Sequence, residues 1–125
     1  MNNKSRPKHL NLFKVRLPIS GIASILHRLS GLLLFLATPL MLYILTISFK
    51  NNSGFEQAKL YLDSMWVKFI ILILIWSAMH HFLAGLRYLV IDMDVGLSKN
   101  SANLSALLVS VLALVLSIII IIGVL

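Results

Sequence analysis

Two groups of polar side chains lie inside stretches of sequence that are otherwise apolar. One is the pair His80 and His81, and the other is Ser24 with His27 and Arg28. Polar groups are costly inside a membrane-spanning helix, so these residues are the first candidates for chemistry. A histidine in such a place either binds haem iron or hydrogen-bonds a neighbouring helix. For a histidine considered by itself, the two possibilities are about equal.

His81 lies six residues before Arg87, or about 9 Å along a helix axis. It therefore lies within the apolar stretch but close to its charged boundary. Ala84 and Gly85 follow one turn later and predict a shallow recess where a flat macrocycle could lie against the backbone. Tyr88 continues the same face toward the surface, where it could hydrogen-bond propionates or partner side chains. One histidine leaves the second axial position of an iron open, so we expect another chain to fill it.

His80 points about 100° away from His81 around the helix, and we expect it to face a partner helix. Ser24 and Arg28 share a face of an earlier helix, with His27 beside them. A hydroxyl and a cation at the border of lipid and water suit a quinone, whose oxygens need hydrogen bonds and gain negative charge on reduction. The alternative is that Ser24 bonds a carbonyl of its own helix and Arg28 reaches lipid phosphates.

The composition predicts the helices that position these groups. The chain has 125 residues, of which 59% are hydrophobic and 12% charged, and a soluble protein of this size needs far more polar surface. Three stretches reach the length of about 20 apolar residues that crosses a bilayer. We predict an all-α, three-helix membrane bundle that forms one domain over residues 1–125. It has a basic arm and three spans: 1–19, 20–49, 64–92 and 103–125.

The connections between the spans follow from local signals. Pro18 suits the start of the first span. We expect a plain turn at 51–54, a short interfacial helix at 55–63 and an inner loop at 93–102, after which Asn103 caps the third span. Small residues at i, i+4, i+7 and i+11 on that span predict a face that packs closely on protein: Ala106, Ser110, Ala113 and Ser117.

The net charge of +7 is distributed in a way that argues against nucleic-acid binding. Such a basic cluster beside a membrane helix marks the cytoplasmic side and meets anionic lipid or a partner. With the N-terminus inside and the C-terminus outside, eight basic residues lie inside and three outside. The absence of cysteine excludes disulfides and iron–sulfur clusters held by this chain alone. Six basic residues precede the first span, with no acid among them: Lys4, Arg6, Lys8, Lys14, Arg16 and Arg28.

Two motifs give the chain a resemblance to a known family. The first, SILHRLSG at 24–31 preceded by RLPIS at 16–20, resembles the signature that opens the first helix of succinate dehydrogenase cytochrome b subunits. The second resembles another signature of the same family, a histidine followed by Gly-x-Arg and a downstream acid: His81, Gly85, Arg87 and Asp92. Both motifs occur in the expected order on the expected helices, and the resemblance covers essentially the whole chain.

The resemblance implies cofactors, partners and residue roles. In that family a flavoprotein oxidises succinate, an iron–sulfur protein relays electrons, and two membrane subunits bind haem b and ubiquinone. His81 would be one axial haem ligand, and the second membrane subunit would supply the other. Ser24 and Arg28 would contact ubiquinone. Tyr88 departs from the histidine that relatives often carry at that position. Contacts to the haem propionates or pocket are implied for four residues: His27, Arg28, Gly85 and Tyr88.

The resemblance implies a membrane-anchoring haem b subunit of succinate dehydrogenase, and we expect it to have no catalytic residue and no activity by itself. We expect it in a bacterial inner membrane, since the arm is short and lacks a transit peptide; a mitochondrial inner membrane is the second choice. One alternative is a haem-free anchor of a related quinone-linked fumarate reductase or dehydrogenase, in which His81 only packs. Another is a small pore-forming or scaffold protein without a redox role.

Overall fold

The computed structural model describes residues 17–124, so most of the predicted basic arm lies outside the described residues. Within residues 17–124, three helices are long and apolar enough to cross a membrane. The predicted all-α membrane bundle is therefore confirmed. Four helices follow one another along these described residues: α1 (Ile19–Ser48), α2 (Asn52–Asp63), α3 (Met65–Asp92) and α4 (Lys99–Val124).

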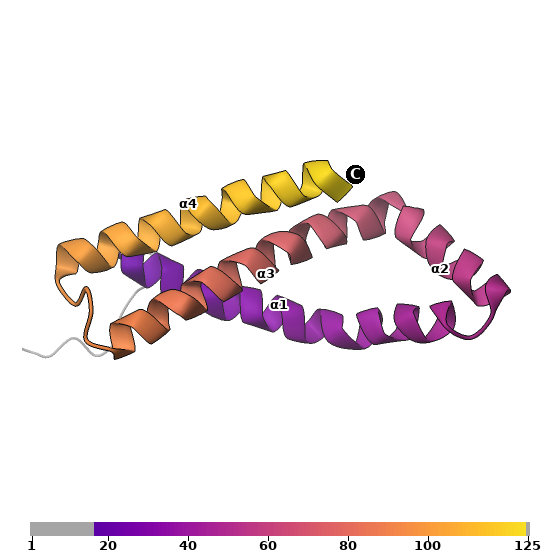
Figure 1. Ribbon diagram of the computed structural model, residues 1–125, viewed down its shortest axis with the longest axis horizontal. Helices are drawn as coiled ribbons and strands as arrows, with labels where there is room; N and C mark the ends of the chain where they lie inside the picture. Colours follow the sequence, from indigo (N-terminus) through magenta and orange to yellow (C-terminus); the bar gives the residue numbers. More distant parts are fainter. Residues whose placement is uncertain (1–16, 125) are drawn as a thin grey trace, which may run out of the picture.

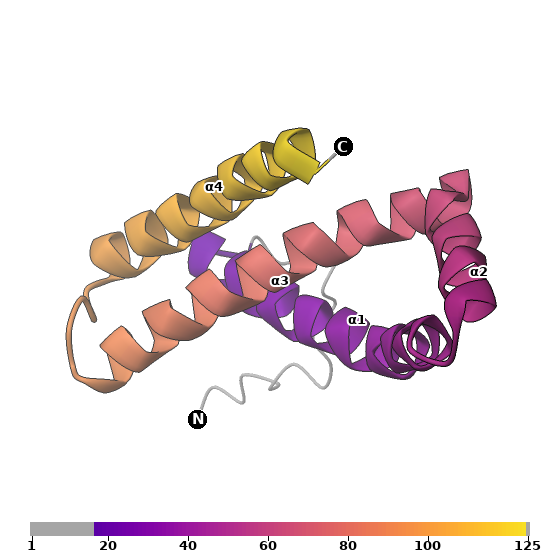
Figure 2. The same cartoon turned by 45° about the vertical axis from the view of Figure 1, so that its right-hand side comes forward.

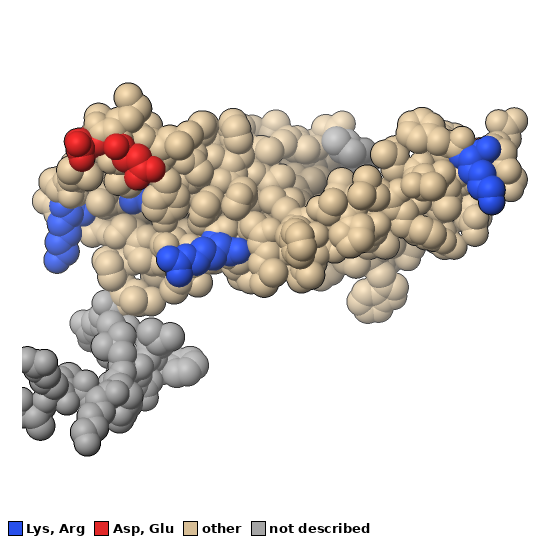
Figure 3. Space-filling view, turned by 90° about the horizontal axis from the view of Figure 1, so that it is seen from below, with Lys and Arg blue, Asp and Glu red and all other residues tan. Residues whose placement is uncertain are grey.

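The two longest helices cross each other and then separate. α1 packs against α3, and α4 lies along α3 and beside the first turns of α1 (Figures 1 and 2). Beyond the crossing, α1 and α3 diverge, and the short helix α2 joins the end of one to the start of the other (Figure 1). Charged side chains lie toward the two ends of the molecule, with a long uncharged stretch between them (Figure 3). This distribution suits helices that cross hydrocarbon.

Local sequence signals explain where the first two helices begin. α1 begins directly after Pro18, as predicted, and the Pro18 carbonyl accepts hydrogen bonds from the first turn. α2 begins at Asn52, so the predicted plain turn at 51–54 is wrong beyond its first residue. The reason is that the Asn51 side chain accepts a hydrogen bond from the Gly54 amide at 2.7 Å and so caps the helix.

The prediction that Asn103 caps the third span is also wrong. α4 begins four residues earlier, at Lys99, where the Ser98 hydroxyl accepts a hydrogen bond from the Ser101 amide at 3.2 Å. Asn103 lies inside α4, and its side-chain oxygen accepts from the Ser20 amide at 3.2 Å. That amide belongs to the first turn of α1, whose donors have no partner within their own helix. A residue of the last helix therefore caps the first.

The core is built mainly from small side chains. The predicted small-residue face of α4 packs on protein, because Ala106, Ala113 and Ser117 are buried. Small residues allow helix backbones to approach closely. Large Leu, Ile and Phe side chains are exposed on most of the remaining surface, where they can meet lipid or other chains. The buried face of α3 consists of four residues: Ser77, His80, Ala84 and Arg87.

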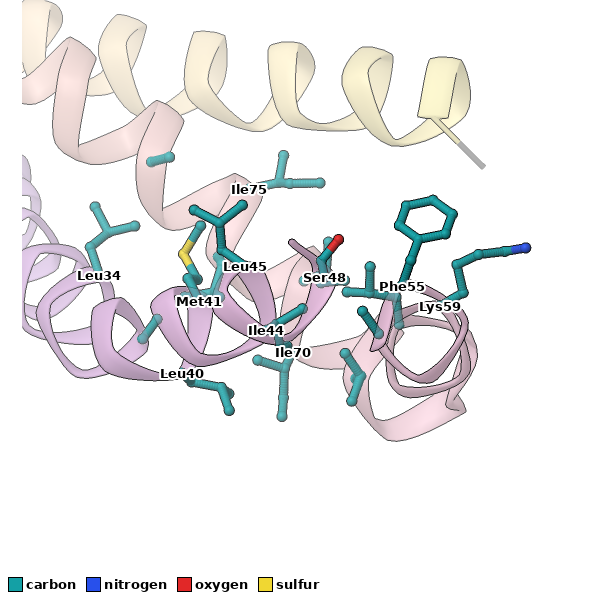
Figure 4. Close-up of a pocket in the computed structure, with 17 residues that line it drawn as sticks. Leu34, Leu40, Met41, Ile44, Leu45, Ser48, Phe55, Lys59, Ile70 and Ile75 are labelled. Atoms are coloured by element: carbon teal, nitrogen blue, oxygen red, sulfur yellow. The ribbon is translucent and has the colours of Figure 1, made fainter. Parts of the chain in front are cut away.

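An apolar cavity of about 530 Å³ lies where α1 and α3 diverge (Figure 4). Its walls are aliphatic side chains such as Leu34, Met41 and Ile75, and α2 contributes Phe55 and Lys59 at one end. None of the residues predicted to carry chemistry lines this cavity. The candidate site therefore lies in the other half of the molecule.

Replacing Gly54 with alanine is expected to destabilise the junction between α1 and α2. A Cβ atom at this position would overlap the backbone carbonyl oxygen of Ile47, which cannot swing away as a flexible side chain can. We expect a loss of about 1–3 kcal/mol, measured as a lower thermal unfolding midpoint of the protein purified in detergent. Gly123→Ala is the control, since a Cβ there has nothing within 4 Å. An unchanged midpoint for the Gly54 variant would contradict the prediction.

Candidate functional site

A stacked pair of histidines joins α1 to α3. The imidazole rings of His27 and His81 have centroids 4.2 Å apart and planes inclined by 9°. The Nδ1 atom of His81 lies 3.1 Å from the backbone carbonyl oxygen of His27 and 3.4 Å from the Ser30 hydroxyl. The Ser30 hydroxyl donates to the same carbonyl at 2.8 Å. One edge of the His81 ring is therefore held by α1.

Two glycines give these rings their space. A Cβ atom at Gly31 would come within 2.8 Å of Cε1 and 3.1 Å of Nδ1 of His81. A Cβ atom at Gly85 would stand 3.8 Å from Nε2 of His27. Each glycine thus faces the histidine of the other helix. The recess predicted beside Gly85 is occupied in this chain by the edge of the His27 ring.

The adjacent histidines of α3 differ in their surroundings. His80 is fully buried and stacks on Trp76, with 5.3 Å between ring centroids. Neither of its nitrogens has a hydrogen-bond partner among the described residues. His81 is half-buried, and both of its side-chain hydrogen bonds to other residues of 17–124 involve Nδ1. Its Nε2 atom is not fully buried and has no hydrogen-bond partner among residues 17–124. It is therefore the atom that can meet a group from outside the chain.

Tyr88 lies beside this pair. Its ring is tilted against that of His27, with 5.3 Å between centroids. Its hydroxyl is buried and has no hydrogen-bond partner within residues 17–124. Leaving a buried hydroxyl unpaired costs about 1–3 kcal/mol, so this position favours a polar atom supplied by another molecule.

Arg87 has a role that its position in the sequence does not reveal. It ends the second apolar stretch and looks like a boundary charge, yet its side chain is 7% exposed. Its Nε donates to the Ser105 hydroxyl and its Nη2 to the Ala102 carbonyl, both at 2.9 Å. Arg87 therefore ties α3 to α4. The Gly-x-Arg motif marks the residue, but its partners lie on a later helix and give no local signal.

Ser24 and Arg28 lie on α1 on either side of His27, the first half-buried and the second exposed. Within residues 17–124, the Ser24 hydroxyl makes no hydrogen bond to its own helix and Arg28 forms no ion pair. None of these residues therefore prevents either group from contacting an outside ligand. Three other hydroxyls of α1 do bond carbonyls of their own helix: Ser30, Thr38 and Thr46.

The comparison with known proteins decides the family. Residues 2–120 match the family described as the succinate dehydrogenase/fumarate reductase transmembrane subunit. The chain belongs to this family. It is 35% identical to the succinate dehydrogenase cytochrome b556 subunit of Coxiella burnetii, over 92% of this chain and 95% of that protein. The subunit of the same name from Paracoccus denitrificans is 34% identical, over 85% of this chain and 82% of that relative.

Membership in the transmembrane subunit family fits the three candidate spans and separates this chain from the catalytic subunits of such enzymes. A Rickettsia felis protein, again a succinate dehydrogenase cytochrome b556 subunit, is 27% identical over 93% of this chain and 89% of its own length. With its bacterial relatives, the chain is a multi-pass protein of a bacterial inner membrane. The predicted family and location are confirmed, while the direction in which the chain crosses the membrane stays a prediction.

Proposed function

We propose that this chain is the membrane-anchoring haem b subunit of a succinate dehydrogenase, and that it helps to pass electrons from an iron–sulfur subunit to ubiquinone. The observation that carries the proposal is the orientation of His81. Its ring is stacked on His27 and held at Nδ1 by α1, while Nε2 is left for an outside group. The relatives named cytochrome b556 subunits support the assignment of a b-type haem.

The residues present fit a haem shared with a second membrane subunit. Among the described residues, no group of three or more His, Cys, Asp or Glu side chains could hold a metal ion. Haem iron needs no such group, because the porphyrin nitrogens supply most of its ligands; His81 would supply one imidazole from this chain, and the second membrane subunit would supply another. The unpaired, buried hydroxyl of Tyr88 suits a propionate, with His27 and Arg28 nearby on α1. When bound, the haem supplies a one-electron store.

Ser24 and Arg28 would hold the quinone at the same end of α1. The Ser24 hydroxyl can donate a hydrogen bond to one quinone oxygen. The Arg28 guanidinium can stabilise the negative charge that develops on these oxygens during reduction. Because His27 lies between them in the sequence and stacks on His81, the haem ligand and the quinone contacts belong to one region of the α1–α3 pair. The second membrane subunit would complete both sites.

The direction of the chain across the membrane follows from the same proposal. An N-terminus on the inner side places His81, Ser24 and Arg28 toward the face where the iron–sulfur and flavoprotein subunits would dock. The basic residues that precede the first span would meet these partners or anionic lipid on that face.

Ser24→Ala and Arg28→Leu are expected to lose quinone reduction while succinate oxidation is retained. Removing one group that stabilises developing charge costs about 10²–10³-fold in rate, and neither change touches the succinate-oxidising subunit. The measurement compares succinate:quinone with succinate:dye activity of the assembled complex in membranes. Thr46→Val is a matched control, because it removes a hydroxyl of α1 that bonds only its own helix. Unchanged quinone reduction in both variants would rule out this quinone site.

A further inference from the structure

The contact between His81 and a backbone carbonyl decides where the ring proton lies. A neutral imidazole carries its proton on either Nδ1 or Nε2. The His27 carbonyl oxygen, which can only accept a hydrogen bond, lies 3.1 Å from Nδ1. An unprotonated Nδ1 would set two lone pairs against each other at this distance. The proton is therefore on Nδ1, and Nε2 keeps the lone pair that a metal ion requires.

Ser30 completes this arrangement from the next turn of α1. Its hydroxyl donates to the His27 carbonyl at 2.8 Å and lies 3.4 Å from Nδ1 of His81. Because the hydroxyl proton points at the carbonyl, a lone pair of its oxygen can face the Nδ1 proton. Ser30 is fully buried, so neither water nor lipid competes for these contacts. The hydroxyl and the carbonyl act together as a two-part acceptor for one N–H group.

We propose that Ser30 is a positioning residue for the haem ligand: together with the His27 carbonyl it holds His81 in the Nδ1-protonated form and fixes the direction of Nε2. The inference rests on the proposed function, since it takes His81 as the ligand. Partners of the second nitrogen of a metal-binding histidine orient its ring and raise its basicity, and losing such a partner weakens metal binding about 10- to 100-fold. In Ser30→Ala the carbonyl remains, so the effect belongs at the lower end of that range.

The test uses the assembled complex in detergent. Ser30→Ala is expected to keep its haem but to transfer it to excess haem-free myoglobin about tenfold faster than the wild type. The g-values of its ferric haem and its midpoint potential are expected to shift, because both respond to the orientation and basicity of the imidazole. Ser77→Ala is the matched control. Ser77 is fully buried, lies on α3 one turn before His81, and its hydroxyl has no partner among the described residues.

The possible results distinguish a wrong role for Ser30 from a wrong assignment of His81 as the haem ligand. A Ser30→Ala complex with wild-type haem transfer and wild-type g-values overturns the proposal. An equal change in Ser77→Ala also overturns it, since the effect would then come from loosened packing. Where Ser30→Ala fails to assemble, the nearly isosteric Ser30→Cys decides by the same two measurements. Loss of haem in His81→Ala with no effect of Ser30→Ala refutes only the positioning role, whereas haem retained in His81→Ala refutes the ligand itself.

Discussion

Replacing His81 with alanine is expected to remove the b-type absorbance of the assembled complex. The change deletes the one imidazole of α3 that is half-exposed and oriented by α1, so under the proposed function a haem would lose the ligand that this chain supplies. We expect oxidation of succinate with artificial dyes to continue, because under the proposed function that reaction belongs to another subunit. The measurement is a reduced-minus-oxidised difference spectrum, scaled to the flavin content of the same preparation.

The neighbouring histidine provides the control for this experiment. His80 is fully buried and stacked on Trp76, so His80→Ala removes an equal volume one residue away without touching the outward-facing nitrogen. We expect this variant to lose stability, because it leaves a cavity, but to keep its b-type absorbance. An unaltered spectrum in His81→Ala, or loss of haem in His80→Ala alone, would show that the ligand has been misassigned. A wild-type complex without b-type absorbance would favour a haem-free anchor.

Gly31→Ala is expected to displace the His81 ring. Haem binding is then expected to be weakened or lost, although His81 itself is unchanged. The added Cβ would stand 2.8 Å from Cε1 and 3.1 Å from Nδ1. The ring has little freedom to retreat, because it is stacked on His27 and bonded to its carbonyl. Replacing glycine with alanine normally stabilises a helix by about 1 kcal/mol. Weaker haem binding in Gly31→Ala would therefore not come from a weakened helix, but from the contact between the new Cβ and the His81 ring.

The same substitution elsewhere on α1 tests that explanation. A Cβ at Gly21 has ordinary contacts, the nearest being Cδ of Pro18 at 3.5 Å. Gly21→Ala should therefore match the wild type in haem-to-flavin ratio, while Gly31→Ala falls below it. Equal ratios in the two variants would contradict the close approach of Gly31 to His81.

The spans were predictable because their signal is local and strong. A helix that crosses hydrocarbon needs about 20 consecutive apolar residues, and no folded geometry is required to count them. The small-residue face of α4 was predictable for the same reason, since Ala106 and Ala113 repeat at helical spacing. The start of α4 was misplaced because Asn103 is a good capping residue and Ser98 is another. Only the structure shows that Asn103 serves the Ser20 amide of a different helix.

The details of the candidate site depend on contacts across helices, which no local pattern encodes. His81 stood out because an imidazole is rare in such an apolar stretch. Its stacking on His27 and its contact with Ser30 join residues more than fifty positions apart and follow from the way α1 and α3 cross. Ser30 lies inside a recognised motif but resembles any small helical residue in sequence. Its burial and its two contacts are what distinguish it.

The buried Arg87 also bears on how the protein enters the membrane during synthesis. α3 leaves the ribosome before α4, so the guanidinium first meets only water and lipid headgroups. Its final partners, the Ala102 carbonyl and the Ser105 hydroxyl, belong to the segment made next. Carrying an unpaired arginine into hydrocarbon costs at least about 2.5 kcal/mol at the bilayer centre and less near the border. We therefore expect the last two spans to insert as a hairpin, with the arginine leaving the headgroups only when the following helix arrives.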